Sequence, residues 1–205
     1  MAFENIIIGG GGKSPKMEKL FLDNIKNSGR MLLCPLASDD LALTLSSRRK
    51  WIESARPDLQ MDILLDGSTD MNEYDAMIIT GGNTARLMNA VNKFGLAEKF
   101  NVFRRSGKVI YGTSAGAMIM APDIEIDPET CGNVEREGNL LGLNWLCGLY
   151  VAPHWPNYAE KFMREFCHVR GVCAICCPED QGAIFDSDGN LVRTIGNDVE
   201  FIEPN

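Results

Sequence analysis

Short apolar runs alternate along this chain with longer stretches in which apolar residues recur every three or four positions. Short apolar runs are typical of buried strands, and the longer spacing is typical of helices. In the first half, the runs predicted to be strands are residues 5–8, 30–35, 61–65, 76–80 and 108–111. The stretches predicted to be helices are residues 16–27, 41–54, 84–92 and 96–106. Strands separated by helices predict an α/β fold whose mostly parallel sheet is covered on both faces.

The alternation is less regular in the second half of the chain. Two further strands are predicted at residues 149–152 and 172–177, with a helix over 157–167 between them. Residues 183–195 predict a terminal hairpin around an Asp-Gly-Asn turn. The sequence contains no repeat and no linker, and its length is sufficient for one well-packed core. We therefore expect a single domain over residues 1–205.

The composition is that of a globular protein, with 45% hydrophobic and 23% charged residues. A net charge of −8 disfavours a nucleic-acid partner. No apolar run has membrane-spanning length and no signal-peptide pattern opens the chain, which predicts a cytoplasmic protein with no membrane partner. The sequence leaves the oligomeric state open, a homodimer included.

Seven cysteines raise the question of disulfides or a metal site. Their odd number and irregular spacing argue against a disulfide framework. Cys173 and Cys176 have CxxC spacing, but they lie in an apolar run and no second pair follows. Thiols in such a run commonly pack as small hydrophobic groups. The sequence therefore predicts buried cysteines, no metal site and no cofactor.

The stretch around Ser114 carries the strongest chemical signal in the chain. The predicted strand at residues 108–111 leads into Gly-Thr-Ser-Ala-Gly at residues 112–116, and small residues follow. This order is that of a nucleophile elbow, in which a sharp strand-to-helix turn exposes a serine at the edge of a sheet. The backbone N–H of Ala115 would then face an oxyanion. A second glycine turn, at residues 80–84, could present the N–H of Gly82 as the other donor.

A serine nucleophile needs a base, and the chain has two histidines. We favour His154, which follows a predicted strand and lies between two prolines, over His168 at a predicted helix end. The acid that orients the histidine is less defined by the sequence. Glu179 and Asp180 follow the next strand, whereas Asp123 and Asp127 would give the chain order of the α/β-hydrolases.

The glycine-rich segment at residues 9–14 resembles a phosphate-binding loop only superficially. Position 7, where a P-loop requires its first glycine, is Ile7, and Ser14 stands where a dinucleotide-binding motif has its third glycine. We therefore interpret this segment as a tight backbone turn beside the site.

Taken together, these motifs resemble the dipeptidase E and cyanophycinase family of serine peptidases. The matching pieces occur in the family's order, and they are the N-terminal strand with its glycine turn, residues 81–84, residues 112–117, Pro153-His154 and residues 179–185. The resemblance implies a three-layer α/β/α sandwich like that of class I glutamine amidotransferases. It also implies Ser114 as nucleophile, His154 as general base and then acid, and the N–H groups of Gly82 and Ala115 as oxyanion donors. Asp180 is the expected orienting acid, with Glu179 as the alternative.

The resemblance further implies a small peptide substrate with a free N-terminus. The loop after His154 is short, so Lys161 and Arg164 are the nearest candidates in the sequence to meet a substrate carboxylate. Two alternatives remain open at this point. One is a catalytically silent binding module that keeps the fold, and the other is an amidotransferase-like glutaminase, although that chemistry normally places cysteine in the elbow.

Overall fold

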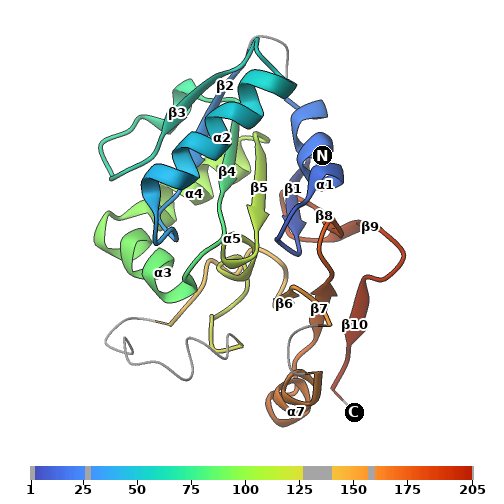
Figure 1. Cartoon of the computed structure of the whole chain (residues 1–205). Coiled ribbons are helices and arrows are strands. Elements are labelled where there is room, and N and C mark those ends of the chain that lie inside the picture. Colours follow the sequence, from blue (N-terminus) through green and yellow to red (C-terminus); the bar gives the residue numbers. More distant parts are fainter. Residues whose placement is uncertain (1–2, 26–28, 127–139, 157–159, 205) are drawn as a thin grey trace.

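The largest element of the structure is a seven-stranded sheet with the strand order β3-β2-β4-β5-β1-β8-β9 (Figure 1). The computed structural model describes residues 3–25, 29–126, 140–156 and 160–204. The strands of this sheet are β1 (Glu4–Gly9), β2 (Arg30–Cys34), β3 (Gln60–Ile63), β4 (Ala76–Ile79), β5 (Val109–Thr113), β8 (Gly182–Asp186) and β9 (Leu191–Ile195). From β3 to β1 all neighbours run parallel, whereas β8 and β9 are antiparallel. The mostly parallel sheet and the terminal hairpin are thus confirmed.

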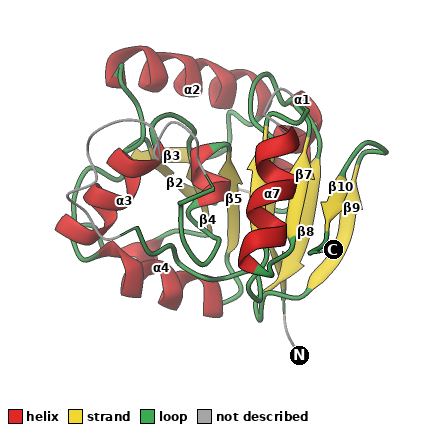
Figure 2. Ribbon diagram, turned by 90° about the horizontal axis from the view of Figure 1, so that it is seen from below, coloured by secondary structure: helices red, strands yellow, loops and turns green. Residues whose placement is uncertain are grey.

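Helices cover both faces of this sheet. The described helices are α1 (Pro15–Asp23), α2 (Leu41–Ala55), α3 (Thr84–Lys93), α4 (Leu96–Arg105), the short α5 (Ala115–Met118) and α7 (Glu160–Arg170), with a 3-10 turn, η1 (Met71–Glu73). Successive residues of β1 point to opposite faces. Ile7 packs in one core cluster with Phe21 of α1 and Ile52 of α2, and Ile6 packs in another with Leu87 of α3. Figure 2 shows the resulting layers, which confirm the α/β/α sandwich.

A second, three-stranded sheet lies beside the large one, and the sequence pattern did not predict it as a separate sheet. It has the order β10-β7-β6 and consists of β6 (Tyr150–Pro153), β7 (Ala174–Cys177) and β10 (Glu200–Ile202). β6 and β7 are parallel, and α7 lies between them in sequence. A third core cluster joins this sheet to α7 through Met163 and Cys167, and to the chain after the elbow through Met118.

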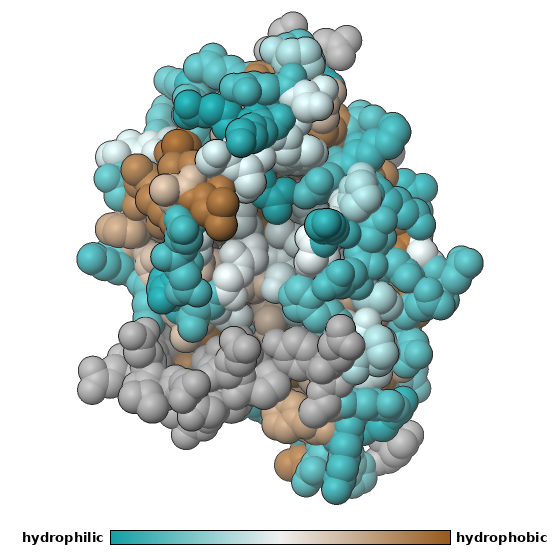
Figure 3. Space-filling model, viewed as in Figure 1, coloured by the Kyte–Doolittle hydropathy of each residue, from teal (hydrophilic) through white to brown (hydrophobic). Residues whose placement is uncertain are grey.

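The helix α2 contacts the sheet mainly through its C-terminal half. Ile52 is its buried residue, whereas Leu41 and Leu43 near its start are 40% and 66% exposed. Figure 3 shows apolar side chains gathered beside this end of α2. The N-terminal half of α2 is therefore available to line a site. Among the described helices, none is long and apolar enough to cross a membrane.

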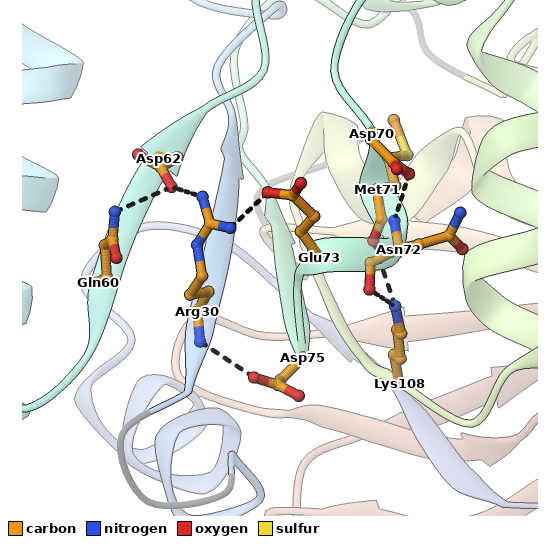
Figure 4. Close-up of polar contacts among 9 residues, drawn as sticks. All are labelled: Arg30, Gln60, Asp62, Asp70, Met71, Asn72, Glu73, Asp75 and Lys108. Carbon is orange, nitrogen blue, oxygen red and sulfur yellow. Dashed lines mark hydrogen bonds and ion pairs between the residues drawn. The ribbon is translucent and has the colours of Figure 1, made fainter.

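Polar contacts tie together the strand ends that lie away from the glycine turns (Figure 4). The Arg30 guanidinium lies between two carboxylates, with Nη2 2.8 Å from Asp62 Oδ2 and Nη1 2.5 Å from Glu73 Oε2. These hydrogen bonds raise the pKa of Arg30 above its usual range. Lys108, just before β5, donates to the carbonyls of Met71 and Asn72. The charged side chains at this edge of the sheet therefore hold its strands and loops together.

The glycine turns lie at the opposite edge of the sheet. In register, Gly112 of β5 lies beside Ile8 of β1 and Ile79 of β4. The three strands therefore end at the same level, and the loops that follow them converge. In open α/β sheets, ligands bind at such carboxyl ends of strands.

Candidate active site

Ser114 stands on a strained turn between β5 and α5. Its backbone has φ 52° and ψ −119°, a conformation that side-chain-bearing residues rarely adopt. The Ser114 N–H donates to Gly9 O at 3.1 Å, and the Met118 N–H donates to Ser114 O at 3.0 Å. A Cβ on Gly116 would overlap the carbonyl of Ile79, so glycine is required for the turn to pack against β4. Strain of this kind is concentrated at functional sites.

The imidazole of His154 lies directly against this serine. His154 follows β6 with φ +56°, and its N–H donates to Gly10 O at 2.8 Å. Its Nε2 is 2.9 Å from Ser114 Oγ. This distance is within the range for proton transfer from a nucleophile to a base. The structure therefore brings together the two residues that the sequence singled out.

Glu179, on the loop after β7, lies on the other side of the imidazole. Its Oε1 is 3.5 Å from His154 Nδ1, and its side chain is 55% exposed. The separation is that of an ion pair rather than a close hydrogen bond. Contacts between catalytic groups are often long without substrate and shorten in the reacting complex. A Ser114–His154–Glu179 series is thus present in the structure.

Asp180, the acid favoured by the sequence, faces another element. Its Oδ1 accepts hydrogen bonds from the backbone N–H groups of Lys16 at 2.7 Å and Met17 at 3.3 Å. These groups open α1, where a carboxylate satisfies unpaired donors and is favoured by the helix dipole. The backbone of Asp180 is in the left-handed region, with φ +57°. The structure therefore places Glu179, and not Asp180, beside His154.

The other acid candidates are not placed at this site either. Asp123 is buried and accepts hydrogen bonds from Tyr150 Oη at 2.6 Å and Arg170 Nη2 at 3.2 Å. Burial, and then the hydrogen bond to Asp123, raise the pKa of Tyr150 above its usual range. Asp123 thus holds the second sheet to the chain after the elbow. Asp127 lies outside the described residues.

Glycines pack tightly around Ser114, His154 and Glu179. At Gly11, with φ +95°, a Cβ would overlap the His154 ring, and at Gly12 it would overlap the Glu179 carboxylate. At Gly81 a Cβ would lie 2.9 Å from Ser114 Cβ. The turn at residues 9–14 therefore does lie beside the site, and side chains at Gly11 and Gly12 would displace His154 or Glu179.

The two expected oxyanion donors lie at neighbouring strand ends. Ala115 is the first residue of α5, so its N–H has no partner within the helix. Gly82 follows β4 with φ +135°, and a Cβ there would overlap the carbonyl of Ala37. Gly82 and Ser114 line the same cavity. The arrangement is suited to holding a carbonyl oxygen between the ends of β4 and β5.

This cavity has a volume of about 290 Å³ and opens onto Ser114 and His154. Its remaining lining residues come from the glycine turns, the strand ends and α2, namely Gly11, Gly12, Gly81, Gly82, Thr80, Thr113, Thr44, Ser47 and Arg48. A serine and a histidine in contact beside a small cavity that the glycine turn after β4 also lines can perform acyl transfer.

Comparison with known proteins agrees with this geometry. The sequence profile of peptidase family S51 matches residues 6–194. The chain belongs to this family. The resemblance to dipeptidase E that the motifs indicated is therefore confirmed, and by family the protein is a peptidase.

Individual relatives are distant from this S51 peptidase. An uncharacterized peptidase of Pasteurella multocida, PM1590, is 29% identical over 103 residues, or 49% of each chain. The pyridoxal 5'-phosphate synthase subunit PdxT of Listeria welshimeri is 30% identical over 67 residues, which are 33% of this chain and 36% of PdxT. The matches thus span from about a third to about half of these curated relatives.

Two solved structures share the fold of this S51 peptidase. A peptidase E protein from Listeria monocytogenes EGD-e superposes with a TM-score of 0.66 at 20% identity, over 100% of both chains. A peptidase from an acI-B1 Actinobacterium superposes with a TM-score of 0.71 at 13% identity, over 99% of this chain and 95% of that one. At these identities the likeness establishes the fold alone.

The cations expected to meet a substrate are not at the site of this S51 peptidase. Lys161 and Arg164 line a separate cavity of about 840 Å³ between α7 and β10, together with His168. Arg164 also pairs with Glu160, one turn earlier on α7. The expectation was wrong because Lys161 and Arg164 follow His154 closely in the sequence but line a different cavity in the structure. α7 packs on the second sheet, outside the cavity of Ser114.

The polar face of α2 is the part of the site that sequence reasoning missed. Thr44, Ser47 and Arg48 occupy positions i, i+3 and i+4, which share one face of a helix. Asp40 caps the start of α2 by accepting from the Leu43 N–H at 2.9 Å. The spacing was readable from the sequence, but a polar helix face is most often solvated. Only the tertiary structure shows that this face covers the elbow.

The expectation of buried cysteines holds for four of the described ones, whereas Cys173 is half-buried and Cys147 is exposed. Cys34, Cys176 and Cys177 are buried in strands. Burial raises the pKa of the thiols of Cys34 and Cys176 to about 12, so they stay protonated near neutral pH. In the described part of the chain, no three side chains of the metal-binding types cluster. Cys131 lies outside that part.

Proposed function

We propose that this protein is a serine peptidase that hydrolyses short peptides through an acyl-enzyme on Ser114. The observation that carries the proposal is the distance of 2.9 Å between Ser114 Oγ and His154 Nε2, on an elbow whose backbone is strained. A serine and a histidine that had only a structural role would not require a strained backbone. Family membership supports a peptidase, and the geometry supports the serine type.

The reaction follows from the position of each group. As Ser114 Oγ attacks the substrate carbonyl carbon, its proton passes to His154 Nε2. The carbonyl oxygen becomes an oxyanion, which the N–H groups of Ala115 and Gly82 stabilise. His154 then gives the proton to the departing amine, and the C–N bond breaks. Water attacks the remaining ester by the same route in reverse, which releases the acid and restores the serine.

Glu179 has a positioning role in this scheme. Its carboxylate faces His154 Nδ1, and it favours the tautomer with a proton on Nδ1 and a lone pair on Nε2 facing Ser114. It also stabilises the imidazolium that forms when the proton is transferred. Because the Glu179 side chain is half-exposed, solvent screens its interaction with His154 until substrate covers the site.

The acid assignment predicts a clear difference between two neighbouring isosteric variants. Glu179→Gln should lower kcat by about 10²- to 10⁴-fold with little change in KM, because the wrong tautomer is then favoured. Asp180→Asn should stay within a few-fold of wild type, since its side-chain oxygen still accepts from the start of α1. Steady-state kinetics of both variants on one dipeptide provide the measurement. A large loss for Asp180→Asn with a mild Glu179→Gln would reverse the assignment.

The proposed function is tested with a panel of dipeptides that have a free N-terminus and differ in the first residue. We expect release of free amino acids, with a modest preference for aspartate at the first position, and labelling by a fluorophosphonate probe. Glutamine should release no ammonia, since glutaminases of this fold normally carry cysteine in the elbow. Ammonia release without peptide hydrolysis would favour the glutaminase. Absence of hydrolysis together with absence of labelling would favour a silent binding module.

The cytoplasmic location, the lack of nucleic-acid and membrane partners and the open question of a homodimer stay predictions from the sequence.

A further inference from the structure

The side chain of Glu179 has little to hold it in place. In the described part of the chain, the structure shows no polar contact of its carboxylate other than the one of 3.5 Å with His154 Nδ1, and the side chain is 55% exposed. A side chain that takes part in catalysis must be held within about 0.5 Å of its working position. The position of Glu179 is therefore set mainly by the residues that hold its backbone.

The backbone next to Glu179 is attached to the same residue as His154. The Gly10 N–H donates to Gln181 O at 3.0 Å, and Gly10 O accepts from the His154 N–H at 2.8 Å. A Cβ on Gly10 would lie 2.0 Å from Pro178 O, so the start of this loop also packs against the glycine turn. The separation between Glu179 and His154 thus depends on how Gln181 is oriented on Gly10.

The side chain of Gln181 is fixed by Asp198. Gln181 Nε2 donates to Asp198 Oδ2 at 2.8 Å, and Gln181 Oε1 accepts from the Asp198 N–H at 2.9 Å. Because an amide donates through its nitrogen and accepts through its oxygen, these two bonds are made together in one orientation of the side chain. The pair therefore fixes the residue that bonds to Gly10.

This pair lies where the chain passes from the large sheet to the second sheet. In register, Gly182 of β8 lies beside Ile195 of β9, so Gln181 and Gly196 face each other just beyond the ends of these strands. A Cβ on Gly196 would lie 2.2 Å from Gln181 Oε1, so the two residues are in close contact. Residues 196–199 then lead from β9 to β10 (Figure 1). The loop of Glu179 is thus braced against the connection between the two sheets.

We propose that Gln181 is a positioning residue, which holds Glu179 against His154 through its two hydrogen bonds to Asp198. This inference rests on the proposed function and adds a residue that acts in it through Glu179. Glu179, Gln181 and Asp198 line one cavity of about 310 Å³, so the pair is next to the side chain that it positions. Asp180 anchors the same loop on the start of α1. Loss of the pair should therefore loosen Glu179 without releasing the loop.

The first test is Gln181→Met, which keeps the length of the side chain and removes both hydrogen bonds to Asp198. We expect kcat on a dipeptide to fall about 10-fold with little change in KM, a size within the range for residues of one hydrogen-bond network. The matched control is Gln60→Met, the same change on β3, where Gln60 Nε2 lies 3.5 Å from Asp62 Oδ2. This control should retain the wild-type kcat.

The decisive comparison repeats Gln181→Met in a protein that already carries Glu179→Gln. If Gln181 acts through Glu179, the second change has nothing further to remove, and kcat should stay within about twofold of Glu179→Gln alone. A residue with only a structural role would lower kcat by the same factor in both backgrounds. Equal factors would therefore overturn the inference.

An exchange of donor and acceptor keeps the test valid even if Gln181→Met fails to fold. Gln181→Glu alone places a carboxylate against that of Asp198 and should lower kcat. Addition of Asp198→Asn supplies an amide that donates to the new carboxylate, while the backbone N–H of residue 198 donates as before. The exchanged pair should restore kcat to within a few-fold of wild type. An exchanged pair as slow as Gln181→Glu would overturn the inference.

Failure of the inference can be distinguished from failure of the proposed function. Wild-type kcat in Gln181→Met overturns the inference and leaves the proposed function intact. Wild-type kcat in Glu179→Gln removes the acid through which Gln181 acts, so the inference fails while Ser114 and His154 keep their roles. A wild-type protein that neither hydrolyses the dipeptide panel nor reacts with a fluorophosphonate contradicts the proposed function itself, and the inference fails with it.

Discussion

Replacement of Ser114 by alanine is expected to abolish peptide hydrolysis and fluorophosphonate labelling while the protein stays folded. In other enzymes of this mechanism, loss of the nucleophile lowers kcat by about 10⁶-fold. The backbone should tolerate the change, because alanine keeps the same Cβ at φ 52° and the elbow is held by backbone hydrogen bonds. Only the contact of Oγ with His154 is lost. Kinetics, gel-based labelling and thermal unfolding together provide the measurement.

A second serine variant serves as the control. Ser106, at the end of α4, donates its hydroxyl proton to the carbonyl of Phe103 and takes no part in the proposed chemistry. Ser106→Ala should therefore retain both activity and labelling. Labelling that persists in Ser114→Ala would show that another residue is the activated nucleophile.

Replacement of His154 by alanine is expected to have an effect of similar size. Without the imidazole, Ser114 has no base within hydrogen-bonding distance among the described residues, and loss of the histidine base lowers kcat by about 10⁶-fold in a comparable triad. Fluorophosphonate labelling should be lost as well, since the probe reacts only with an activated serine. Kinetics and labelling of the same preparation provide the measurement.

His168→Ala is the matched control for this variant. His168 lies near the end of α7 and lines the cavity between α7 and β10, so its loss should leave kcat within a few-fold of wild type. Equal losses in the two histidine variants would contradict the assignment of His154 as the base.

The large sheet could be predicted because the residues of a strand are themselves enough to indicate that strand. Of its parallel strands, β1, β2, β4 and β5 are short apolar runs bounded by polar residues or glycine, and a helix follows each of them. The second sheet was not predictable in the same way. β6 and β7 were recognised as strands, but nothing in their own residues says that they pair with each other and leave the large sheet. β10 has three residues, too few for a periodic pattern.

Ser114 could be predicted because its strained turn requires glycines that are visible in the sequence, and His154 because it is one of two histidines and follows a predicted strand. The elbow needs glycine at Gly112 and Gly116, where side chains would overlap neighbouring atoms. The sequence holds no such signal for the acid. Glu179 and Asp180 are chemically alike and adjacent, and only the folded structure shows that Asp180 accepts from the start of α1 while Glu179 faces His154.

Arg48 illustrates the limit of reasoning from the sequence. It lies 66 residues before Ser114, and its place in the cavity depends on how α2 crosses the sheet. Lys161 and Arg164 were preferred because they follow His154 closely, but α7 carries them onto another cavity. Which helix covers the site is a property of the tertiary packing, and no local pattern encodes it.

The central claim is that Ser114 is an activated nucleophile, and the site of covalent labelling tests it most directly. The protein is treated with a fluorophosphonate, digested and analysed by tandem mass spectrometry. The account predicts one adduct per chain, on Ser114, and no adduct in the His154→Ala variant. An adduct on a different residue, or undiminished peptide hydrolysis by protein in which Ser114 is fully modified, would contradict it.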